Sequence, residues 1–246
     1  SCPVSAAQPE RQLMKERPTA VYITSPDYLG NSADVEGIAK VCHAHGIPLL
    51  VDNAHGAYLK FLRPSRHPMD LGADLCCDSA HKTLGVVTGG AYLHISRNAP
   101  AWFAEQVKDT MALFGSTSPS YLILQSLDAA NAALAEEYPR QLADLLAQLQ
   151  PLRLRLAAQG YTLLGDEPMK LTLDAKAYGY EGTELAELLQ QGHFDILAHL
   201  TCPLRYITGY HHVEIDLSVF EEKITMILAR IIEKNIAFEV NTSSYD

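Results

Sequence analysis

The sequence predicts an α/β protein: an open sheet with helices on both faces, followed by a small α+β unit. Short apolar runs alternate with an amphipathic stretch up to about residue 96, which indicates strands joined to a helix by short links. From about residue 99 the apolar residues recur with helical spacing. Strand–helix–strand order with short links is typical of an open α/β sheet, whose ligands bind at the carboxyl ends of the strands.

The first elements follow from local sequence patterns. TAVYIT, residues 19–24, predicts a strand that ends at the turn signals of SPDYLGN. SADVEGIAKVCHAHG predicts a helix with Ser32 as its N-cap and Gly46 at its end. The apolar face of this helix consists of Val35, Ile38, Ala39 and Cys42. IPLLVD, LGADLCCDSA and GGAYLHIS predict three further strands.

The later elements define three expected parts. SPSYLILQSLDAANAALAE and YPRQLADLLAQLQPLRLRLAAQG predict helices, with breaks at Pro139 and Gly160. YTLLG and MKLTLDA predict strands of the small unit, and GTELAELLQQG a helix capped by Thr183. FDILAHLTCPLRY and AFEVNTS predict strands on either side of a long helix, LSVFEEKITMILARIIEKN. We expect a partial large domain over 1–135, a linking helix and partial small domain over 136–192, and a separate fragment over 193–246.

Composition excludes several classes of partner. The net charge of −10 argues against a nucleic-acid or anionic-membrane surface, because polyphosphate binding needs a basic footprint. No apolar run approaches the roughly 20 residues that span a bilayer, so we expect no membrane partner. The five cysteines show no C-x-x-C pair, which favours reduced thiols in a cytoplasmic protein. The sequence opens without Met, and we expect that an upstream part is missing.

Two segments together carry the residues that amine chemistry needs. VDNAHG places Asp52 at the end of a buried strand, with Ala54 and His55 just after it, and DSAHKT places Lys82 after the next strand. In enzymes that use pyridoxal phosphate, a lysine amine condenses with the aldehyde and a carboxylate keeps the pyridine nitrogen protonated. The alternatives are a surface lysine after a turn, a carboxylate that caps a helix, and histidines with structural roles.

These segments resemble a known family. TSPDYLG, LLVDNAHGAY and DSAHKT are similar to the cofactor-binding core of the Orn/Lys/Arg decarboxylases, which have the aspartate aminotransferase fold, fold type I, of pyridoxal phosphate enzymes. STSPSYLILQSLDAA and DEPMKLTLDAKAYGYEGTELAELL extend the resemblance to about residues 15–190. Family members have a long stretch before the TAVYIT strand, with a phosphate-binding turn and a ring-stacking side chain that this sequence does not show.

The resemblance implies a role for each motif residue. Lys82 would form the aldimine with pyridoxal phosphate, Asp52 would pair with the pyridine nitrogen, and Ala54 would pack on the ring. The residues expected near the cofactor and its phosphate are His55, Ser79 and His81.

The same resemblance implies a dimer and a reaction. Ser116 and Thr117, in the run that ends at Ser118, would reach the partner subunit's site in a homodimer, although the run could also be a helix-entry cap. The implied reaction is decarboxylation of an amino-acid substrate, lysine, ornithine or arginine, with Lys82 or His81 returning the proton. An aminotransferase or aldolase on the same fold is the nearest alternative.

The last part of the sequence resembles a different family. FDILAHLTCPLRYI and IIEKNIAFEVNTSSYD are similar to an internal piece of a PHP-type metallophosphatase, the histidinol phosphatase family. The resemblance implies that His199 matches a metal ligand and that Asn241 lies in a strand, and it makes a metal-dependent phosphatase a second functional alternative. A single ligand cannot assemble such a site, so we expect a structural role for His199 and no metal, and absence of catalysis is a third alternative. His43 and His45 form an H-x-H pattern of the kind that can bind a metal. Residues two positions apart do not share a helical face, so we expect no metal site there.

Overall fold

The computed structural model describes residues 18–116, 118–180, 196–197 and 237–238. It divides into two compact units, the first ending at Asp174 and the second beginning at Ala175. The strands of the first unit are β1 (Val21–Thr24), β2 (Leu49–Asp52), β3 (Leu75–Asp78), β4 (Tyr92–Ile95), β5 (Leu163–Leu164) and β6 (Thr172–Leu173). Its helices are α2 (Val35–Ala44), α3 (Ala80–Thr83), α4 (Ala101–Phe114), α5 (Tyr121–Glu136), α6 (Tyr138–Ala158) and the 3₁₀ helix η1 (Ala57–Phe61).

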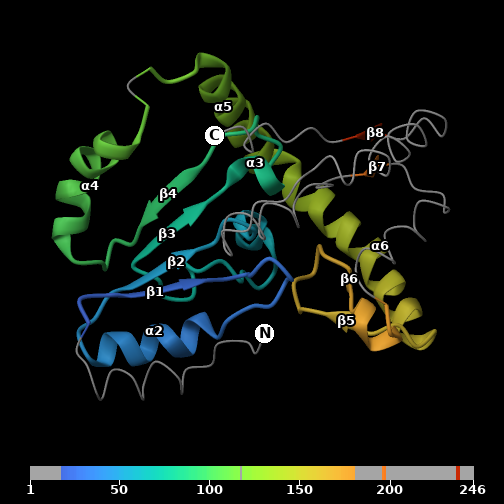
Figure 1. The fold of residues 1–246 in the computed structure, drawn as a ribbon. Coiled ribbons are helices and arrows are strands. Elements are labelled where there is room, and N and C mark those ends of the chain that lie inside the picture. The colour runs from blue at the N-terminus through green and yellow to red at the C-terminus, as the bar shows by residue number, and fades with distance from the viewer. Residues whose placement is uncertain (1–17, 117, 181–195, 198–236, 239–246) are drawn as a thin grey trace, which may run out of the picture. The chain divides into compact units, whose positions relative to one another are not determined.

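The main sheet has the strand order β1-β2-β3-β4 (Figure 1). β1, β2 and β3 are parallel to one another, and β4 runs antiparallel to β3. The direction of β4 follows from the connection before it, because α3 has four residues and is about 6 Å long. Such a short helix cannot carry the chain back along the whole sheet, as a parallel crossover requires. The structure thus confirms the α/β class and the four expected strands.

The register of the sheet brings the ends of its parallel strands together. Thr24 is level with Asp52, and Asp52 is level with Cys77. The turns that follow β1, β2 and β3 therefore leave the sheet at one edge. This edge is the one at which open α/β sheets bind ligands.

Helix α2 covers one face of the sheet. Its buried residues are those expected from the sequence: Val35, Ile38, Ala39 and Cys42. They pack with Leu49 and Val51 of β2, which point to the same face because side chains alternate along a strand. On the opposite face, Tyr22 and Leu93 are exposed.

The predicted N-cap of α2 is wrong. The cap is Asp34, whose Oδ1 accepts a hydrogen bond from the backbone N–H of Gly37 at 3.0 Å. Asp34 directly precedes the first helical residue, so its carboxylate can accept from the backbone N–H of the third helical residue, Gly37, as the side chain of an N-cap residue does. The backbone N–H of Ser32 instead donates to Asp166 at 2.8 Å.

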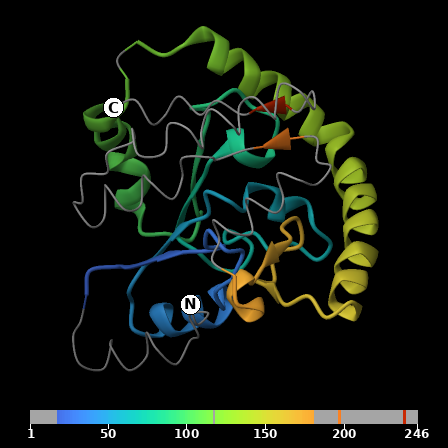
Figure 2. The same cartoon turned by 45° about the vertical axis from the view of Figure 1, so that its right-hand side comes forward.

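A second apolar cluster lies where η1, α3, α5 and α6 meet. Its buried residues are Ala57, Tyr58, Leu59, Ala80, Leu84, Val86, Ala130 and Leu142. Both views show α6 running from α5 at one end to the β5–β6 hairpin at the other (Figure 2). The Tyr138 hydroxyl of α6 donates to the carbonyl of Thr83 at 2.8 Å and so attaches this helix to the segment that carries Lys82.

The second unit is described only in part. η2 (Ala175–Tyr178) forms one 3₁₀ turn, and β7 (Ile196–Leu197) pairs in parallel with β8 (Ala237–Phe238). The helix capped by Thr183, the long helix and the positions Thr117, His199 and Asn241 lie outside the described residues. The expected domain limits near 135 and 192 stay predictions. In the part of the chain that the structure describes, no helix is both long and apolar enough to cross a membrane.

Candidate active site

Lys82 lies at the carboxyl edge of the sheet, on the single turn of helix that follows β3. Its backbone N–H donates to the carbonyl of Ser79 at 3.1 Å, which closes this turn. Its Nζ lies 3.3 Å from Nε2 of His55, which follows β2. The structure therefore brings the VDNAHG and DSAHKT segments together, as the sequence indicated.

Asp52 ends β2 with both carboxylate oxygens in hydrogen bonds. Oδ1 accepts from the backbone N–H of Ala54 at 3.0 Å, and the Cys77 thiol lies 3.8 Å from the same oxygen. Oδ2 accepts from the Tyr22 hydroxyl at 3.1 Å. Partial loss of water around the hydroxyl and then the negative charge of Asp52 raise the pKa of Tyr22, so the phenol stays protonated and continues to donate. Asp52 thus remains an acceptor with a fixed orientation.

Tyr28 is a site residue that the sequence pattern did not single out. It lies in the loop after β1, and its ring meets that of His55 edge to face, with 5.6 Å between the centroids. The only sequence signal was its place in the turn segment SPDYLGN, directly after a predicted strand. Three consecutive turns of the sheet therefore contribute to the surroundings of Lys82.

His81 and Ser79 flank this group. His81 Nδ1 lies 3.0 Å from the carbonyl oxygen of Gly90, which can only accept, so Nδ1 carries the proton and the neutral ring has its lone pair on Nε2. Ser79 precedes α3 as its N-cap, and its hydroxyl makes no capping hydrogen bond there. Both side chains are half-buried at the edge where Lys82 lies.

The Ser116–Ser118 run stands apart from these contacts. The Ser116 hydroxyl accepts from the backbone N–H of Ser118 at 3.1 Å and donates to its carbonyl at 3.2 Å. Among the described residues, no hydrogen bond joins Ser116 to Lys82 or Asp52. The predicted reach of this run into a second subunit stays a prediction.

A buried acid and a buried amine near the site were missed by sequence reasoning. The backbone N–H groups of Asp166 and Glu167 both donate to the carbonyl of Gly30, at 2.9 and 3.0 Å, and hold the DEPMK turn against the loop after β1. Nζ of Lys170 and Oε2 of Glu167 are buried and have no hydrogen-bond partner among the described residues. Burial lowers the pKa of Lys170, and the charge of Lys82 lowers it further, although Glu167 opposes the shift. Perturbed pairs of this kind often lie near functional sites.

The cysteines and the H-x-H pair, His43 and His45, make contacts that indicate structural roles. Burial and nearby carboxylates raise the pKa values of Cys76 and Cys77, which disfavours the reactive thiolate. His43 Nε2 lies 2.8 Å from Asp74 Oδ2, whereas His45 Nδ1 lies 2.9 Å from the carbonyl of Val41. The two rings therefore have separate partners.

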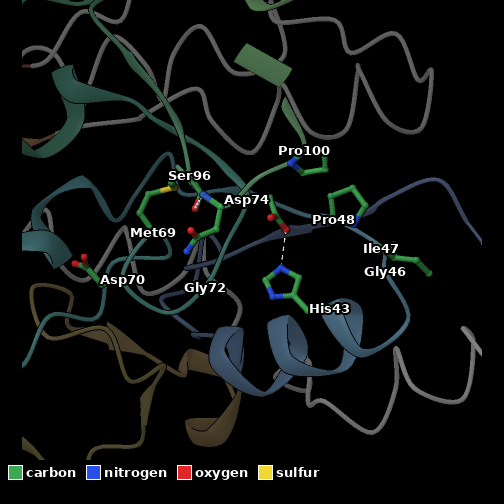
Figure 3. Close-up of a pocket in the computed structure, with 11 residues that line it drawn as sticks. His43, Gly46, Ile47, Pro48, Met69, Asp70, Gly72, Asp74, Ser96 and Pro100 are labelled. Atoms are coloured by element: carbon green, nitrogen blue, oxygen red, sulfur yellow. Dashed lines mark hydrogen bonds and ion pairs between the residues drawn. The ribbon is translucent and has the colours of Figure 1, made fainter. Parts of the chain in front are cut away.

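An open hollow of about 530 Å³ lies at the opposite edge of the sheet (Figure 3). Pro48 and Asp74 line it and precede β2 and β3, and Ser96, which follows the antiparallel β4, lines it too. In Figure 3 the His43 side chain points at Asp74 across the dashed hydrogen bond. Its size suits a small molecule, but it lies away from Lys82 and Asp52 at the edge where such sheets do not carry their chemistry.

Comparison with solved structures supports the fold class. A serine palmitoyltransferase from Sphingomonas wittichii matches with a TM-score of 0.52 and 18% identity, over 67% of this chain and 42% of that one. A complex of SepCysS with the SepCysE N-terminal domain matches with a TM-score of 0.50 and 19% identity, over 66% and 44% of the two chains. At these identities the likeness shows the shared α/β fold alone.

Comparison of sequences defines the family. The family described as "Orn/Lys/Arg decarboxylase, major domain" matches residues 4–172, and the chain belongs to this family. Similar proteins include YaaO of Bacillus subtilis, 34% identical over 70% of this chain, and arginine decarboxylases of Halalkalibacterium halodurans and B. subtilis, 31% and 30% identical over 74% and 78% of it. The chain spans 37%, 39% and 41% of the lengths of these three relatives.

Proposed function

We propose that this chain is the cofactor-binding part of a pyridoxal phosphate-dependent decarboxylase that acts on a basic amino acid. The observation that carries the proposal is the grouping of Lys82, His55 and Asp52 on neighbouring turns at the carboxyl edge of one sheet. Membership of the Orn/Lys/Arg decarboxylase family supports the reaction class, and the named arginine decarboxylases support a basic substrate.

The residues present fit the cofactor by their chemistry. Lys82 offers an exposed primary amine, Asp52 a carboxylate held in place by Tyr22, and Ala54 a small side chain beside it. The Ser79 hydroxyl makes no capping bond and suits a phosphate oxygen. When bound, pyridoxal phosphate supplies an electron sink that accepts the electrons of the bond broken at the substrate's Cα.

The chain's own residues position groups and move protons. Nζ of Lys82 is the attachment point, and the contact with His55 Nε2 holds this amine toward the Asp52 turn. The Asp52 carboxylate would lie beside the ring nitrogen of a bound cofactor, where a negative charge favours the protonated form of that nitrogen. Nε2 of His81 carries a lone pair in the neutral ring, so this atom can hold the proton that returns to Cα.

We further propose a homodimer in a cytoplasmic setting. Leu113, Phe114, Tyr121 and Leu122 flank the Ser116–Ser118 run and are exposed, with Phe114 and Tyr121 each 87% accessible. A concentrated apolar surface of this kind is typical of an interface. Cys42, Cys76 and Cys77 are free thiols, which suits a reducing compartment. Light scattering at several protein concentrations, with Phe114→Glu as the disrupting variant, tests the dimer.

The central experiment is chemical labelling of the purified chain. Pyridoxal phosphate is added, the visible absorbance is recorded, borohydride is applied, and the modified peptide is identified by mass spectrometry. The expected result is one label, on Lys82, that is absent in Lys82→Ala and present in Lys108→Ala, which changes an exposed lysine of α4. A label on another peptide, or no label, contradicts the proposal. Product analysis with lysine, ornithine and arginine then separates decarboxylation from transamination or aldol cleavage.

A further inference from the structure

Asp78, the last residue of β3, is the centre of a buried polar network. The residue is 4% exposed, and its carboxylate makes four close contacts. Oδ2 lies 3.0 Å from His67 Nε2 and 2.9 Å from His94 Nε2, and Oδ1 lies 2.7 Å from Asn53 Nδ2 and 3.6 Å from the Cys76 thiol. A buried carboxylate with this many donors is strongly held in place.

The direction of each hydrogen bond can be assigned. The backbone N–H of Met69 donates to His67 Nδ1 at 3.2 Å, so the His67 proton is on Nε2 and points at Asp78. Burial alone would raise the pKa of Asp78, but the hydrogen bonds from His67 and His94 outweigh it and hold that pKa well below its usual range. The carboxylate is therefore ionised and accepts from every neighbour.

The same assignment argues against a metal ion. Ligand atoms of His67, Asp78 and His94 all lie within 4.8 Å of one another, a spacing that a metal could use. A metal-bound Nε2 needs its lone pair, and the other ring nitrogen then carries a proton that must be donated. Nδ1 of His67 instead faces the N–H of Met69. The cluster is thus arranged for hydrogen bonding.

The network joins the two turns that carry the candidate active site. Asn53, which is fully buried, directly follows Asp52, and Asp78 lies four residues before Lys82. The Asn53 side chain bonds to Asp78, and its backbone N–H bonds to the carbonyl of Cys77 at 2.9 Å. A side-chain bond and a main-chain bond therefore link the same two turns.

We propose that Asp78 and Asn53 are positioning residues, whose hydrogen bond fixes the Lys82 turn relative to the Asp52 turn. This role rests on the proposed function of Lys82. Reactivity at a positioned amine is sensitive to displacements of about 1 Å, which can change rates a hundredfold, and a buried bond to an ionised carboxylate restricts such displacements. His67 and His94 hold the carboxylate in place from the other side.

The test compares Asn53→Ala with His94→Phe. Each removes one hydrogen-bond donor to Asp78, but His94 lies on β4 and links neither turn to the other. We expect Asn53→Ala to slow pyridoxal phosphate labelling of Lys82, per folded molecule, by about tenfold or more, and His94→Phe to leave this rate almost unchanged. Equal rates in the two variants would overturn the proposal. If Asn53→Ala does not fold, Asn53→Ser, whose hydroxyl is too short to reach Asp78, is measured in the same way.

A second readout needs no cofactor. Amide hydrogen exchange of residues 53–56 and 79–83 should accelerate in Asn53→Ala and stay protected in His94→Phe. Unchanged protection in Asn53→Ala overturns the positioning role even if wild-type Lys82 is labelled. Faster exchange in a chain whose Lys82 is never labelled supports the link between the turns and refutes the proposed function instead. Zinc bound in one-to-one ratio by the wild type, and lost in His67→Gln, would show a metal site and overturn the hydrogen-bonded arrangement.

Discussion

Gly56 offers a stringent test of how tightly the Asn53 side chain is held. A Cβ added at Gly56 would lie 2.0 Å from Asn53 Oδ1 and 2.7 Å from Pro26 Cδ, closer than real carbon atoms approach. The backbone of Gly56 has φ −118°, which any residue adopts, so the substitution Gly56→Ala adds a steric conflict and no backbone strain. To relieve the conflict the Asn53 amide must move, and its bond to Asp78 is then lost.

The magnitude follows from two contributions. Overpacking a well-packed interior costs about 1–3 kcal/mol, and losing a buried hydrogen bond to a charged group costs about 1.5–3 kcal/mol. We therefore expect Gly56→Ala to lower the free energy of unfolding by about 2.5–6 kcal/mol, or the thermal midpoint by about 5–24 °C for a unit of this size.

The assay is thermal unfolding followed by far-ultraviolet circular dichroism, with Gly46→Ala as the matched control. Gly46 has φ +67° and no atom within 4 Å of an added Cβ, so alanine there meets backbone strain alone. That strain costs about 1–2 kcal/mol. A loss in Gly56→Ala no larger than that in Gly46→Ala would mean that the Asn53 side chain moves aside freely, and the reasoning about the linked turns would fail.

Three further predictions concern other parts of the chain. Burial raises the pKa of Glu167, so its ionised form opposes folding once the pH exceeds the usual pKa of a glutamate. Glu167→Gln should therefore raise the thermal midpoint near pH 7 but not near pH 4, and a gain that persists near pH 4 would contradict this. Ile38→Ala should lower the free energy of unfolding in urea by about 2–5 kcal/mol, because Ile38 is fully buried against the sheet, whereas Lys40→Ala, at an exposed position, should change it little. Similar losses in the two variants would mean that α2 does not pack on the sheet through this face. Burial raises the pKa of Tyr138 to about 12, so its hydroxyl stays protonated and donates to the Thr83 carbonyl. Tyr138→Phe, which removes this hydrogen bond, should lower the free energy of unfolding by about 1 kcal/mol. No loss would mean that the bond does not form in solution.

Local signals account for what the sequence predicted well. The buried face of α2 follows from 3.6-residue spacing, and β2 and β3 from continuous apolar runs, so both could be identified before any packing was known. Asp52 and Lys82 were identifiable because Asp52 ends one predicted strand and Lys82 follows the next strand within a few residues. The contact between Lys82 and His55 then follows from the parallel pairing of those strands. The predicted N-cap of α2 was wrong for a local reason too. Asp34 directly precedes the helix, whereas Ser32 lies two residues further away, so Asp34 is better placed to accept from the first backbone N–H groups of the helix.

Residues that act through long-range contacts left no such signal. His67 lies 11 positions before Asp78 and His94 lies 16 after it, with no repeat or motif that connects them. The contact of His94 with Asp78 depends on the antiparallel pairing of β4 with β3, which places His94 opposite Cys76. No pattern within the sequence fixes that register. Lys170 approaches the site only because the DEPMK turn bonds to Gly30, about 140 residues earlier. A motif thus identifies the candidate reactive groups, but the residues that hold them in place must be found from the register of the sheet. At Asp78 that register joins both turns of the candidate site to one buried charge.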